Sequence, residues 1–506
     1  MYAESAVART HDTKQVDTFM HLIGVLVGFA GVACVALAAV YVLRLGVLPF
    51  RYALLIFGVD AVIALFPLYL LIKKKFDIKK VLCIVLSALM AIFNLFVVSY
   101  GDLTYNFLND QYGVGSVGNV EYCVVAQSTS RIELQSAKRT LSAGIQSTDI
   151  CKDEAEAEMQ KLAPAEFSEY DNVSELISAT EGGGVEIAVV QTAFLDAFAE
   201  YFPDSYEKLS ILTKFKTDAG TTSSPLDGIA IDITKPFAIY VSGADDYGDI
   251  DQTARSDVNM LVLIDPENYR ILLANTPRDY YVQLHGTNGL PDKLTHAGTY
   301  GIDVSEATLE DLYDINIDYH VHINYDTLIN LIDRLGGISI YNPNEFNLWG
   351  AQFDKGNIYM DGAHALLYAR ARKELPNGDN DRGENQQRVI SGIVARISAA
   401  NVATQYTQIL ERLSGTFRSN IPPSVIAQLF KRQISLGGNW DIETTSATGT
   451  NDQRPTYSMG ADRPLSVIIP DQDSVDAVSE QMQSFLSGVD PEVGSGLGAP
   501  ADSAVE

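Results

Sequence analysis

The chain has 506 residues, with 64 acidic against 36 basic side chains and a formal net charge of −28. This length suits about three domains of ordinary size. The acidity excludes nucleic acid as an expected partner, because binding to a phosphate backbone needs clustered Lys and Arg. Hydrophobic residues make up 47% of the chain, and their longest runs lie near the N-terminus, which indicates a membrane-anchored protein.

Three apolar runs near the N-terminus predict three transmembrane helices. They cover 22–43, about 52–72 and about 81–100, and a run of about 20 apolar residues is long enough to cross a bilayer. The first run is also too long for the apolar part of a signal peptide. We therefore expect a membrane region over 19–101, preceded by a polar segment, 1–18, without regular structure.

The loop between the second and third apolar runs sets the expected orientation. It contains five lysines, whereas the loop between the first two runs contains Arg44 and Arg51. Short loops rich in Lys and Arg remain in the cytoplasm. We therefore expect a multi-pass plasma-membrane protein with segment 1–18 inside and the large region after residue 101 outside the cell.

Residues 102–228 predict an extracellular accessory domain followed by a linker. Strand-like runs at 120–126 and 185–190 alternate with helix-like runs, which favours a small α/β domain. The helix-like runs are 131–145, 152–162 and 192–201. The region contains no catalytic pattern. Cys123 and Cys151 lie in it, where a disulfide is permitted, but the sequence does not show whether the two side chains meet.

Residues 229–475 predict a larger α/β domain with a central mixed sheet flanked by helices. The strand-like segments are 236–243, 258–265, 269–275, 319–323, 338–341 and 465–470. The helix-like segments are 304–313, 325–334, 361–370 and 384–400. Gly336 and Gly337 follow one of these helices, as is typical of a helix end. We expect 476–506 to form a C-terminal helix and a disordered tail.

Charged residues stand at the ends of the first strands of the larger domain. They are Asp245, Arg255, Asp257, Arg278 and Asp279. Strand ends often carry functional sites. Carboxylates suit Mg²⁺, which needs few protein ligands when a phosphate completes its shell, and Arg binds phosphate through two parallel hydrogen bonds. The alternative is a set of solvated loop charges and surface ion pairs.

A second basic cluster lies further along the chain. Arg370, Arg372 and Arg382 flank a single loop, and Gln386 shares a helix face with Arg382 because the two are four residues apart. Three cations beside the start of a helix predict a pyrophosphate site. The alternative is a solvated basic edge that balances an acidic protein.

In order and spacing, these segments resemble the LytR–CpsA–Psr family of bacterial cell-envelope proteins. The resemblance covers about 230–420, and the three apolar runs with the accessory region resemble its capsule-type branch. Family members often have Arg where this chain has Asn385, so one cation of the phosphate cluster is either missing or supplied by Arg388. The matching pieces are Gly243-Ala244-Asp245, Arg255-Ser256-Asp257, Pro277-Arg278-Asp279, Asp292-Lys293, His296-Ala297, Tyr300-Gly301, Asp318-Tyr319, Leu335-Gly336-Gly337-Ile338, Asp361-Gly362, Ala365-Leu366, Tyr368-Ala369-Arg370, Arg382 and Gln386-Gln387.

The resemblance implies a membrane-anchored phosphotransferase of the Gram-positive envelope. Such an enzyme moves a glycopolymer, capsular polysaccharide or teichoic-acid-like, from a polyprenyl pyrophosphate carrier onto peptidoglycan outside the cell. Envelope-assembly proteins are further partners that it allows. The alternative is a non-catalytic polyprenyl-phosphate-binding sensor or transcription attenuator, which would need a cytoplasmic DNA reader. The predicted cytoplasmic segments are too short for one.

The resemblance also assigns roles to individual residues. Asp245 and Asp257 would hold Mg²⁺ or Mn²⁺, and Asp257, Asp279 and Arg255 would act in catalysis. It also places the prenyl tail in an apolar slot, whose candidate residues the sequence cannot distinguish from ordinary core. The pyrophosphate ligands would be Arg255, Arg278, Arg370, Arg372, Arg382 and Gln386. The candidate slot residues are Leu261, Leu263, Ile323, Leu328, Ile332, Leu366, Val389 and Ile393.

Overall fold

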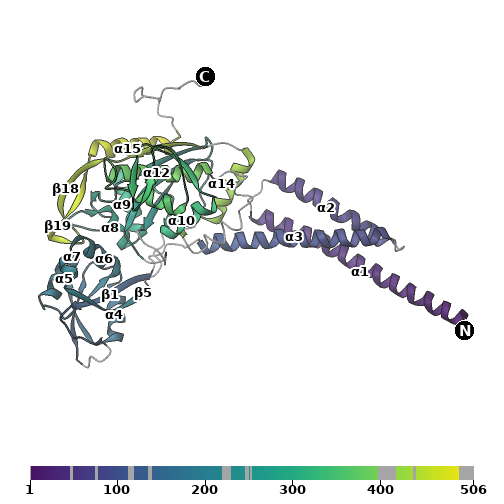
Figure 1. Ribbon diagram of the computed structural model, residues 1–506, viewed down its shortest axis with the longest axis horizontal. Coiled ribbons are helices and arrows are strands. Elements are labelled where there is room, and N and C mark those ends of the chain that lie inside the picture. The colour runs from purple at the N-terminus through teal and green to yellow at the C-terminus, as the bar shows by residue number, and fades with distance from the viewer. Residues whose placement is uncertain are drawn as a thin grey trace, which may run out of the picture. The chain divides into compact units, whose positions relative to one another are not determined.

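The computed structural model describes residues 2–45, 50–73, 78–111, 119–134, 139–218, 230–244, 250, 253–396, 417–436 and 440–488. These residues form two compact units (Figure 1). The first unit contains the N-terminal helices and α14 (Pro423–Leu436), and the second contains both predicted α/β domains. Most of the predicted linker and the predicted tail beyond residue 488 lie outside the described residues.

Three long helices in the first unit confirm the three predicted spans. They are α1 (Tyr2–Leu45), α2 (Phe50–Ile72) and α3 (Ile78–Gln111). Their stretches long and apolar enough to cross a membrane are Thr18–Arg44, Phe50–Ile72 and Lys79–Leu103. Segment 1–18, predicted to lack regular structure, is instead helical from Tyr2 onward. It contains neither Pro nor Gly, so nothing in its sequence interrupts the helix that follows.

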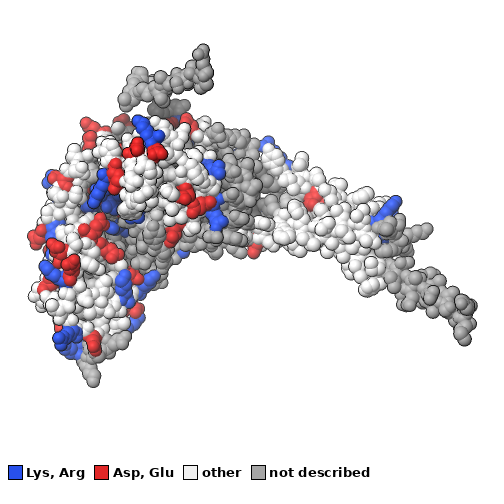
Figure 2. All heavy atoms as spheres, in the orientation of Figure 1, with Lys and Arg blue, Asp and Glu red and all other residues white. Residues whose placement is uncertain are grey.

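Glycines on α1 allow its neighbours to approach closely. A Cβ atom on Gly28 would lie 2.9 Å from Cδ1 of Leu68 in α2, and one on Gly31 would lie 3.0 Å from the backbone oxygen of Ser87 in α3. Packing through small residues is typical of membrane helices. The visible surface of these helices carries few charges over most of its length (Figure 2), as contact with lipid requires.

The accessory domain has a five-stranded sheet in the order β3-β2-β4-β1-β5, with helices packed against it. The helix predicted over 131–145 is wrong, because 141–146 form β2. This strand lies inside the sheet between β3 and β4 and is almost fully buried, and a Cβ on Gly144 would collide with Leu176 of α5. The strands are β1 (Asn119–Gln127), β2 (Leu141–Gln146), β3 (Ala165–Tyr170), β4 (Ile187–Gln191) and β5 (Leu209–Asp218); the helices are α4 (Lys152–Leu162), α5 (Val173–Glu181), α6 (Thr192–Tyr201) and α7 (Pro203–Tyr206).

The two cysteines of the accessory domain are not bonded to each other. Cys123 and Cys151 are both buried free thiols. The Sγ atom of Cys123 lies 3.3 Å from Oγ1 of Thr192 at the start of α6. The domain is therefore held together by its apolar core and sheet, without a disulfide between these two residues.

The large domain is built on a central mixed sheet, as predicted, and the sheet has six strands. Its order is β16-β11-β6-β7-β8-β17. The β11–β6 and β17–β8 pairs are parallel, and the other neighbours are antiparallel. The strands are β6 (Phe237–Ala244), β7 (Ser256–Asp265), β8 (Arg270–Thr276), β11 (Tyr319–Ile323), β16 (Phe417–Ser419) and β17 (Asp441–Ser446).

Helices cover both faces of this sheet. Successive side chains of a strand point to opposite faces, and in these strands both sets are apolar. Leu261 and Leu263 of β7 pack in the core with α9 (Ile302–Tyr313) and α15 (Gln472–Leu486), whereas Met260 faces α12 (Asp379–Arg396). The predicted strand at 465–470 lies in β19, which pairs with β18 outside the central sheet. The remaining elements are β9 (Tyr281–Val282), β10 (Asp292–Lys293), α8 (Leu294–Ala297), η2 (Gly298–Tyr300), α10 (Tyr325–Arg334), β12 (Ile338–Asn342), β13 (Phe346–Leu348), β14 (Ala351–Phe353), β15 (Gly356–Met360), α11 (Gly362–Arg370), β18 (Gly449–Thr456) and β19 (Gly460–Pro470).

The accessory domain packs against the β18–β19 hairpin of the large domain. Figure 1 shows α5, α6 and α7 beside this hairpin. The backbone nitrogen of Val173 donates a hydrogen bond to the oxygen of Ser458 over 3.0 Å. The guanidinium of Arg463 lies 5.0 Å from the ring centres of both Phe198 and Phe202. The end of α6 is thereby held on the large domain.

Candidate active site

A cavity of about 550 Å³ lies where the predicted basic residues converge. Its lining divides into a charged part and an apolar part. Both parts come from the ends of sheet strands and from helices α10, α11 and α12. The charged and polar lining residues are Glu200, Asp257, Arg278, Arg370, Arg372, Lys373, Glu374, Arg382 and Gln386, and the apolar ones include Val258, Ile323, Leu328, Leu348, Trp349, Leu366 and Ala369.

Strand direction explains how residues distant in sequence meet at this cavity. β7 and β8 are antiparallel, and Asn259 near the start of β7 pairs with Thr276 at the end of β8. Asp257 and Arg278 therefore leave the same edge of the sheet. Helix α11 ends at Arg370 and α12 begins at Asp379, so the loop between these helices brings the second basic cluster to that edge.

Asp257 is largely buried, with its side chain 15% exposed, and is engaged through both carboxylate oxygens. Arg278 donates a hydrogen bond from Nη1 to Oδ2, and the Thr295 hydroxyl donates to Oδ1 over 3.1 Å. Burial alone would raise the pKa of Asp257. The positive charges of Arg278 and Arg382 and the hydrogen bond from Arg278 outweigh it and hold this pKa well below its usual range. Asp257 is therefore a fixed anion among cations.

Asp279 forms a second buried centre of negative charge. Lys293 donates to its Oδ1 over 3.1 Å, and Nη2 of Arg372 lies 3.3 Å from its Oδ2. Burial opposes ionisation here as well, but the charges of Lys293, Arg278 and Arg372 lower the pKa of Asp279. The carboxylate of Asp279 thus positions Lys293 and Arg372, two cations that are far apart in the sequence.

Arg278 has donor capacity left over inside the site. Its side chain is 8% exposed, and besides its bond to Asp257 it lies 3.7 Å through Nε from Oδ1 of Asp279. The Nε atom is buried and makes no hydrogen bond within the described part of the chain. A buried guanidinium N–H without an acceptor is costly, and the charge of the Asp279 carboxylate 3.7 Å away offsets part of this cost.

Aromatic rings and a carboxylate hold the other arginines. The guanidinium of Arg370 lies 4.6 Å from the ring centre of Tyr325 and 5.3 Å from that of Trp349. Arg382 pairs with Asp379 over 2.5 Å, and Nε of Arg372 lies 3.7 Å from the same oxygen. Stacking and pairing of this kind fix planar guanidinium groups in place. The cations of the cavity are therefore preorganised.

Gln386 and Arg388 have different positions on α12. Gln386 lines the cavity, with its Nε2 3.4 Å from the backbone oxygen of Ala369. Arg388 does not replace the arginine that family members often have at position 385. It pairs with Glu384 over 2.6 Å and lines another cavity instead. Asn385 itself donates to the backbone oxygen of Tyr368.

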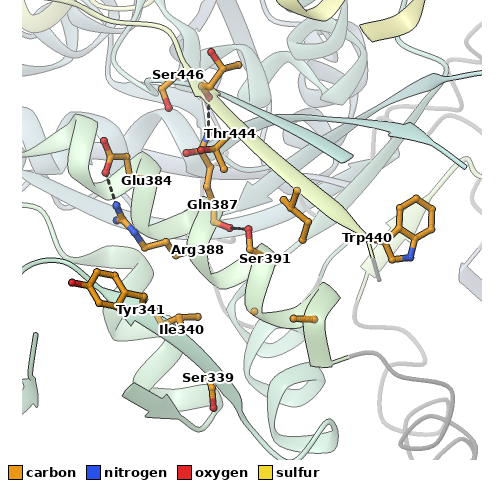
Figure 3. A pocket seen from close by; sticks show the side chains of 14 residues that line it. Ser339, Ile340, Tyr341, Glu384, Gln387, Arg388, Ser391, Trp440, Thr444 and Ser446 are labelled. Atoms are coloured by element: carbon orange, nitrogen blue, oxygen red, sulfur yellow. Dashed lines mark hydrogen bonds and ion pairs between the residues drawn. The ribbon is translucent and has the colours of Figure 1, made fainter. Parts of the chain in front are cut away.

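The second cavity is larger, about 720 Å³, and lies on the other side of α12 (Figure 3). Its charged groups are already paired. Figure 3 shows Arg388 directed at Glu384, and the amide of Gln387 donates to the backbone oxygens of Thr445 and Leu273. Without convergent cations, this cavity is a poorer candidate for anion chemistry than the smaller one.

Among the predicted site residues that the structure describes, Asp279 and Arg255 do not line the smaller cavity. Asp245 lies outside the described residues. Arg255, predicted to bind pyrophosphate, is partly buried and pairs with Glu200 of α6 over 2.6 Å. No pattern in the sequence indicated Glu200, because its position depends on how the accessory domain docks. It also left out Lys293, whose basic side chain directly follows an acid in one of the family motifs.

The family of this chain follows from its similarity to known proteins. Residues 205–484, more than half of the chain, match the model of the LytR_cpsA_psr family. The chain belongs to the LytR–CpsA–Psr family. This match includes the entire cavity of the large domain except for Glu200, which the accessory domain supplies.

Relatives in the family carry names that describe an activity. The chain is 32% identical over 195 residues to the polyisoprenyl-teichoic acid–peptidoglycan teichoic acid transferase TagU of Bacillus cereus, covering 38% of this chain and 63% of that relative, less than two thirds of its length. It is 29% identical over 292 residues to the TagU of Halalkalibacterium halodurans, covering 54% and 91%. The crystal structure of Bacillus subtilis TagV matches at 30% identity and a TM-score of 0.43, covering 51% and 99%.

Some of the candidate residues for a LytR–CpsA–Psr prenyl slot lie in the apolar wall of the cavity, and others lie in the core. Ile323, Leu328 and Leu366 line the cavity. Leu261 and Leu263 lie in the core on the side of the sheet covered by α9 and α15, away from the α12 side. Trp349, in the β13–β14 turn, adds an aromatic surface that is 73% exposed, which the motif search did not identify.

The residues present offer limited support for the implied divalent cation. No group of three or more His, Cys, Asp or Glu side chains suited to a metal occurs within the described ranges. Of the two predicted ligands, Asp257 is ionised and faces the cavity, but Arg278 and Thr295 occupy its oxygens. One carboxylate fits Mg²⁺ only where phosphate oxygens complete the shell.

Proposed function

We propose that this protein is a phosphotransferase that moves a glycopolymer from a polyprenyl pyrophosphate carrier to peptidoglycan on the outer side of the membrane. The observation that carries the proposal is the two-part cavity. Arg278, Arg370, Arg372 and Arg382 surround its charged part, and aliphatic side chains form the rest. A pyrophosphate with a hydrocarbon tail matches both parts, because its phosphates suit the charged part and its tail suits the apolar part. The names of the TagU relatives support the same activity.

The reaction that we propose breaks the pyrophosphate bond. A sugar hydroxyl of peptidoglycan attacks the phosphorus on the polymer side and forms a phosphodiester, while the pyrophosphate P–O bond breaks and polyprenyl phosphate leaves. The hydroxyl proton passes to solvent or to the leaving phosphate. Arg278 and Arg382 are placed to balance the negative charge that shifts onto the leaving phosphate. Bound Mg²⁺ or Mn²⁺, with Asp257 and Asp245 as its protein ligands, would add charge neutralisation.

The buried acids suit positioning better than proton transfer. Asp257 and Asp279 have lowered pKa values because cations surround them, so each is a weak base. Both hold arginines in place, and we assign them this role in the site. We propose further that the polymer is capsular polysaccharide or a teichoic-acid-like polymer. We also propose that the reaction takes place outside the cell and that peptidoglycan is the acceptor.

Lipid bound to the purified protein tests this function. The full-length protein is extracted in detergent beside Arg370→Ala and the control Arg388→Ala, and organic extracts are examined by mass spectrometry. We expect polyprenyl phosphate or pyrophosphate with the native protein and the control, and several-fold less with Arg370→Ala. A transfer assay with Mg²⁺ then separates the enzyme from a non-catalytic sensor. Bound lipid without transfer would favour the sensor, and no isoprenoid phosphate in any sample would contradict the proposal.

A further inference from the structure

The accessory domain places a carboxylate in the cavity of the large domain. Glu200, the second-last residue of α6, pairs with Nη1 of Arg255 over 2.6 Å, and its other oxygen lies 3.8 Å from Nη2 of Arg278. The two arginine side chains are 12% and 8% exposed, whereas that of Glu200 is 47% exposed. Glu200 is thus the most accessible member of this cluster.

The neighbours of Glu200 fix the position of its helix end. The ring of Tyr201 lies 4.7 Å from the ammonium group of Lys293, and its hydroxyl is 3.3 Å from Nε2 of His296. Phe202 stacks beneath Arg463. Glu200 therefore reaches the cavity from a docked helix end, so its pairing with two arginines follows from how the domains pack.

A carboxylate and a phosphate present similar pairs of oxygens to a guanidinium group. Glu200 lines the cavity and Arg255 does not, so the carboxylate lies on the side of Arg255 that a ligand would approach. A phosphate oxygen and Glu200 cannot accept the same N–H bond, and their negative charges repel. The two anions compete for these guanidinium groups.

We propose that Glu200 occupies the anion position on Arg255 and Arg278, so that a phosphate ligand must displace it and binds more weakly than it would without this carboxylate. This inference rests on the proposed function, since it takes pyrophosphate as the ligand. Free phosphate or pyrophosphate has only charge interactions to offset the displacement. A lipid-linked pyrophosphate also gains from burying its tail against the apolar wall. The accessory domain would thereby disfavour soluble anions.

Binding of inorganic pyrophosphate tests this role. The full-length protein in detergent is titrated with pyrophosphate and Mg²⁺ by calorimetry, beside Glu200→Gln and the control Glu207→Gln. Glu207 is an exposed acid of the same domain, so its variant removes the same charge without touching the site. We expect Glu200→Gln to lower the Kd roughly three- to five-fold, as loss of a partly exposed ion pair allows, and Glu207→Gln to change it less than two-fold.

A second pair of proteins separates displacement from a general charge effect. In an Arg255→Gln background, the gain from Glu200→Gln should shrink, because the guanidinium that it releases is absent. An unchanged or higher Kd in Glu200→Gln, or an undiminished gain without Arg255, would overturn the role of Glu200 while the pyrophosphate site remained. Absence of pyrophosphate binding in all the proteins would overturn the proposed site, and this inference with it.

Discussion

Arg278 donates a hydrogen bond to Asp257 across two neighbouring strands of the central sheet, one residue at the end of β8 and the other at the start of β7. The other carboxylate oxygen of Asp257 accepts a hydrogen bond from the hydroxyl of Thr295. The carboxylate therefore fixes the arginine that still has a buried Nε without a hydrogen bond inside the described structure. In the proposed reaction, Arg278 binds the pyrophosphate and Asp257 holds Arg278 in place against the sheet.

The first prediction concerns this pair. Asp257→Asn keeps the shape of the side chain but removes the charge that holds Arg278, and it places an amide where Arg278 needs an acceptor. We expect the rate of glycopolymer transfer to fall roughly 100-fold, the usual effect of losing one preorganised charge contact in an active site. The melting temperature should show that the protein remains folded. Full transfer activity in a folded variant would contradict both the metal and the positioning roles of Asp257.

The second prediction compares two arginines on one helix. Arg382 lines the charged cavity, whereas Arg388 pairs with Glu384 beside the other cavity. Loss of a charged hydrogen-bonding group from a site costs about 1.5–3 kcal/mol, so Arg382→Gln should lower kcat/KM for transfer roughly 10- to 100-fold. Arg388→Gln should leave it within two-fold. Equal losses in the two variants would mean that the helix, and not the cavity, determines the effect.

Helical geometry explains why Arg382 lines the charged cavity and Arg388 does not. Arg382 and Gln386 are four residues apart and share a face, as predicted. Arg388 lies six residues from Arg382, and a rotation of roughly 100° per residue turns it to another side of the helix. Strands β6, β7, β8 and β11 were equally predictable, because apolar runs bounded by turn residues are local signals. The two edge strands of the central sheet, β16 and β17, were not predicted.

Contacts between domains explain what the sequence could not predict. Glu200 looks like an ordinary acid on an amphipathic helix until docking brings it to Arg255. Strand β2 was mistaken for a helix because its six residues contain Ser, Ala and Gly without clear alternation; their position inside the sheet determines their conformation. The pairing of Lys293 with Asp279 likewise depends on β9 and β10, two-residue strands without a pattern.

The third prediction is a pH dependence of stability from Asp279. Its pKa is lowered in the folded protein, against about 3.9 for an unfolded Asp. A lowered folded pKa contributes stability that is present above the unfolded value and lost as the pH falls through the folded value. The native protein should therefore melt at a higher temperature than Asp279→Asn at pH 7, and this difference should shrink below about pH 4.

Taking the difference between the two proteins removes the effects of other groups. Asp318, for example, has a pKa raised by burial and acts in the opposite direction. Scanning calorimetry or intrinsic fluorescence between pH 3 and pH 8 gives the two melting curves. A difference in melting temperature that stays constant over this range would show that Asp279 does not ionise differently in the folded and unfolded chains.

The fourth prediction concerns the side of the membrane on which the cavity lies. An odd number of spans places the region after α3 opposite the N-terminus, and the lysines before α3 favour the cytoplasm. Protease added to intact protoplasts should therefore digest the accessory and large domains, while a tag placed before Thr18 should survive until the membrane is permeabilised. Protection of the large domain in intact protoplasts would reverse the orientation, and it would separate the charged cavity from the peptidoglycan that the proposed reaction requires.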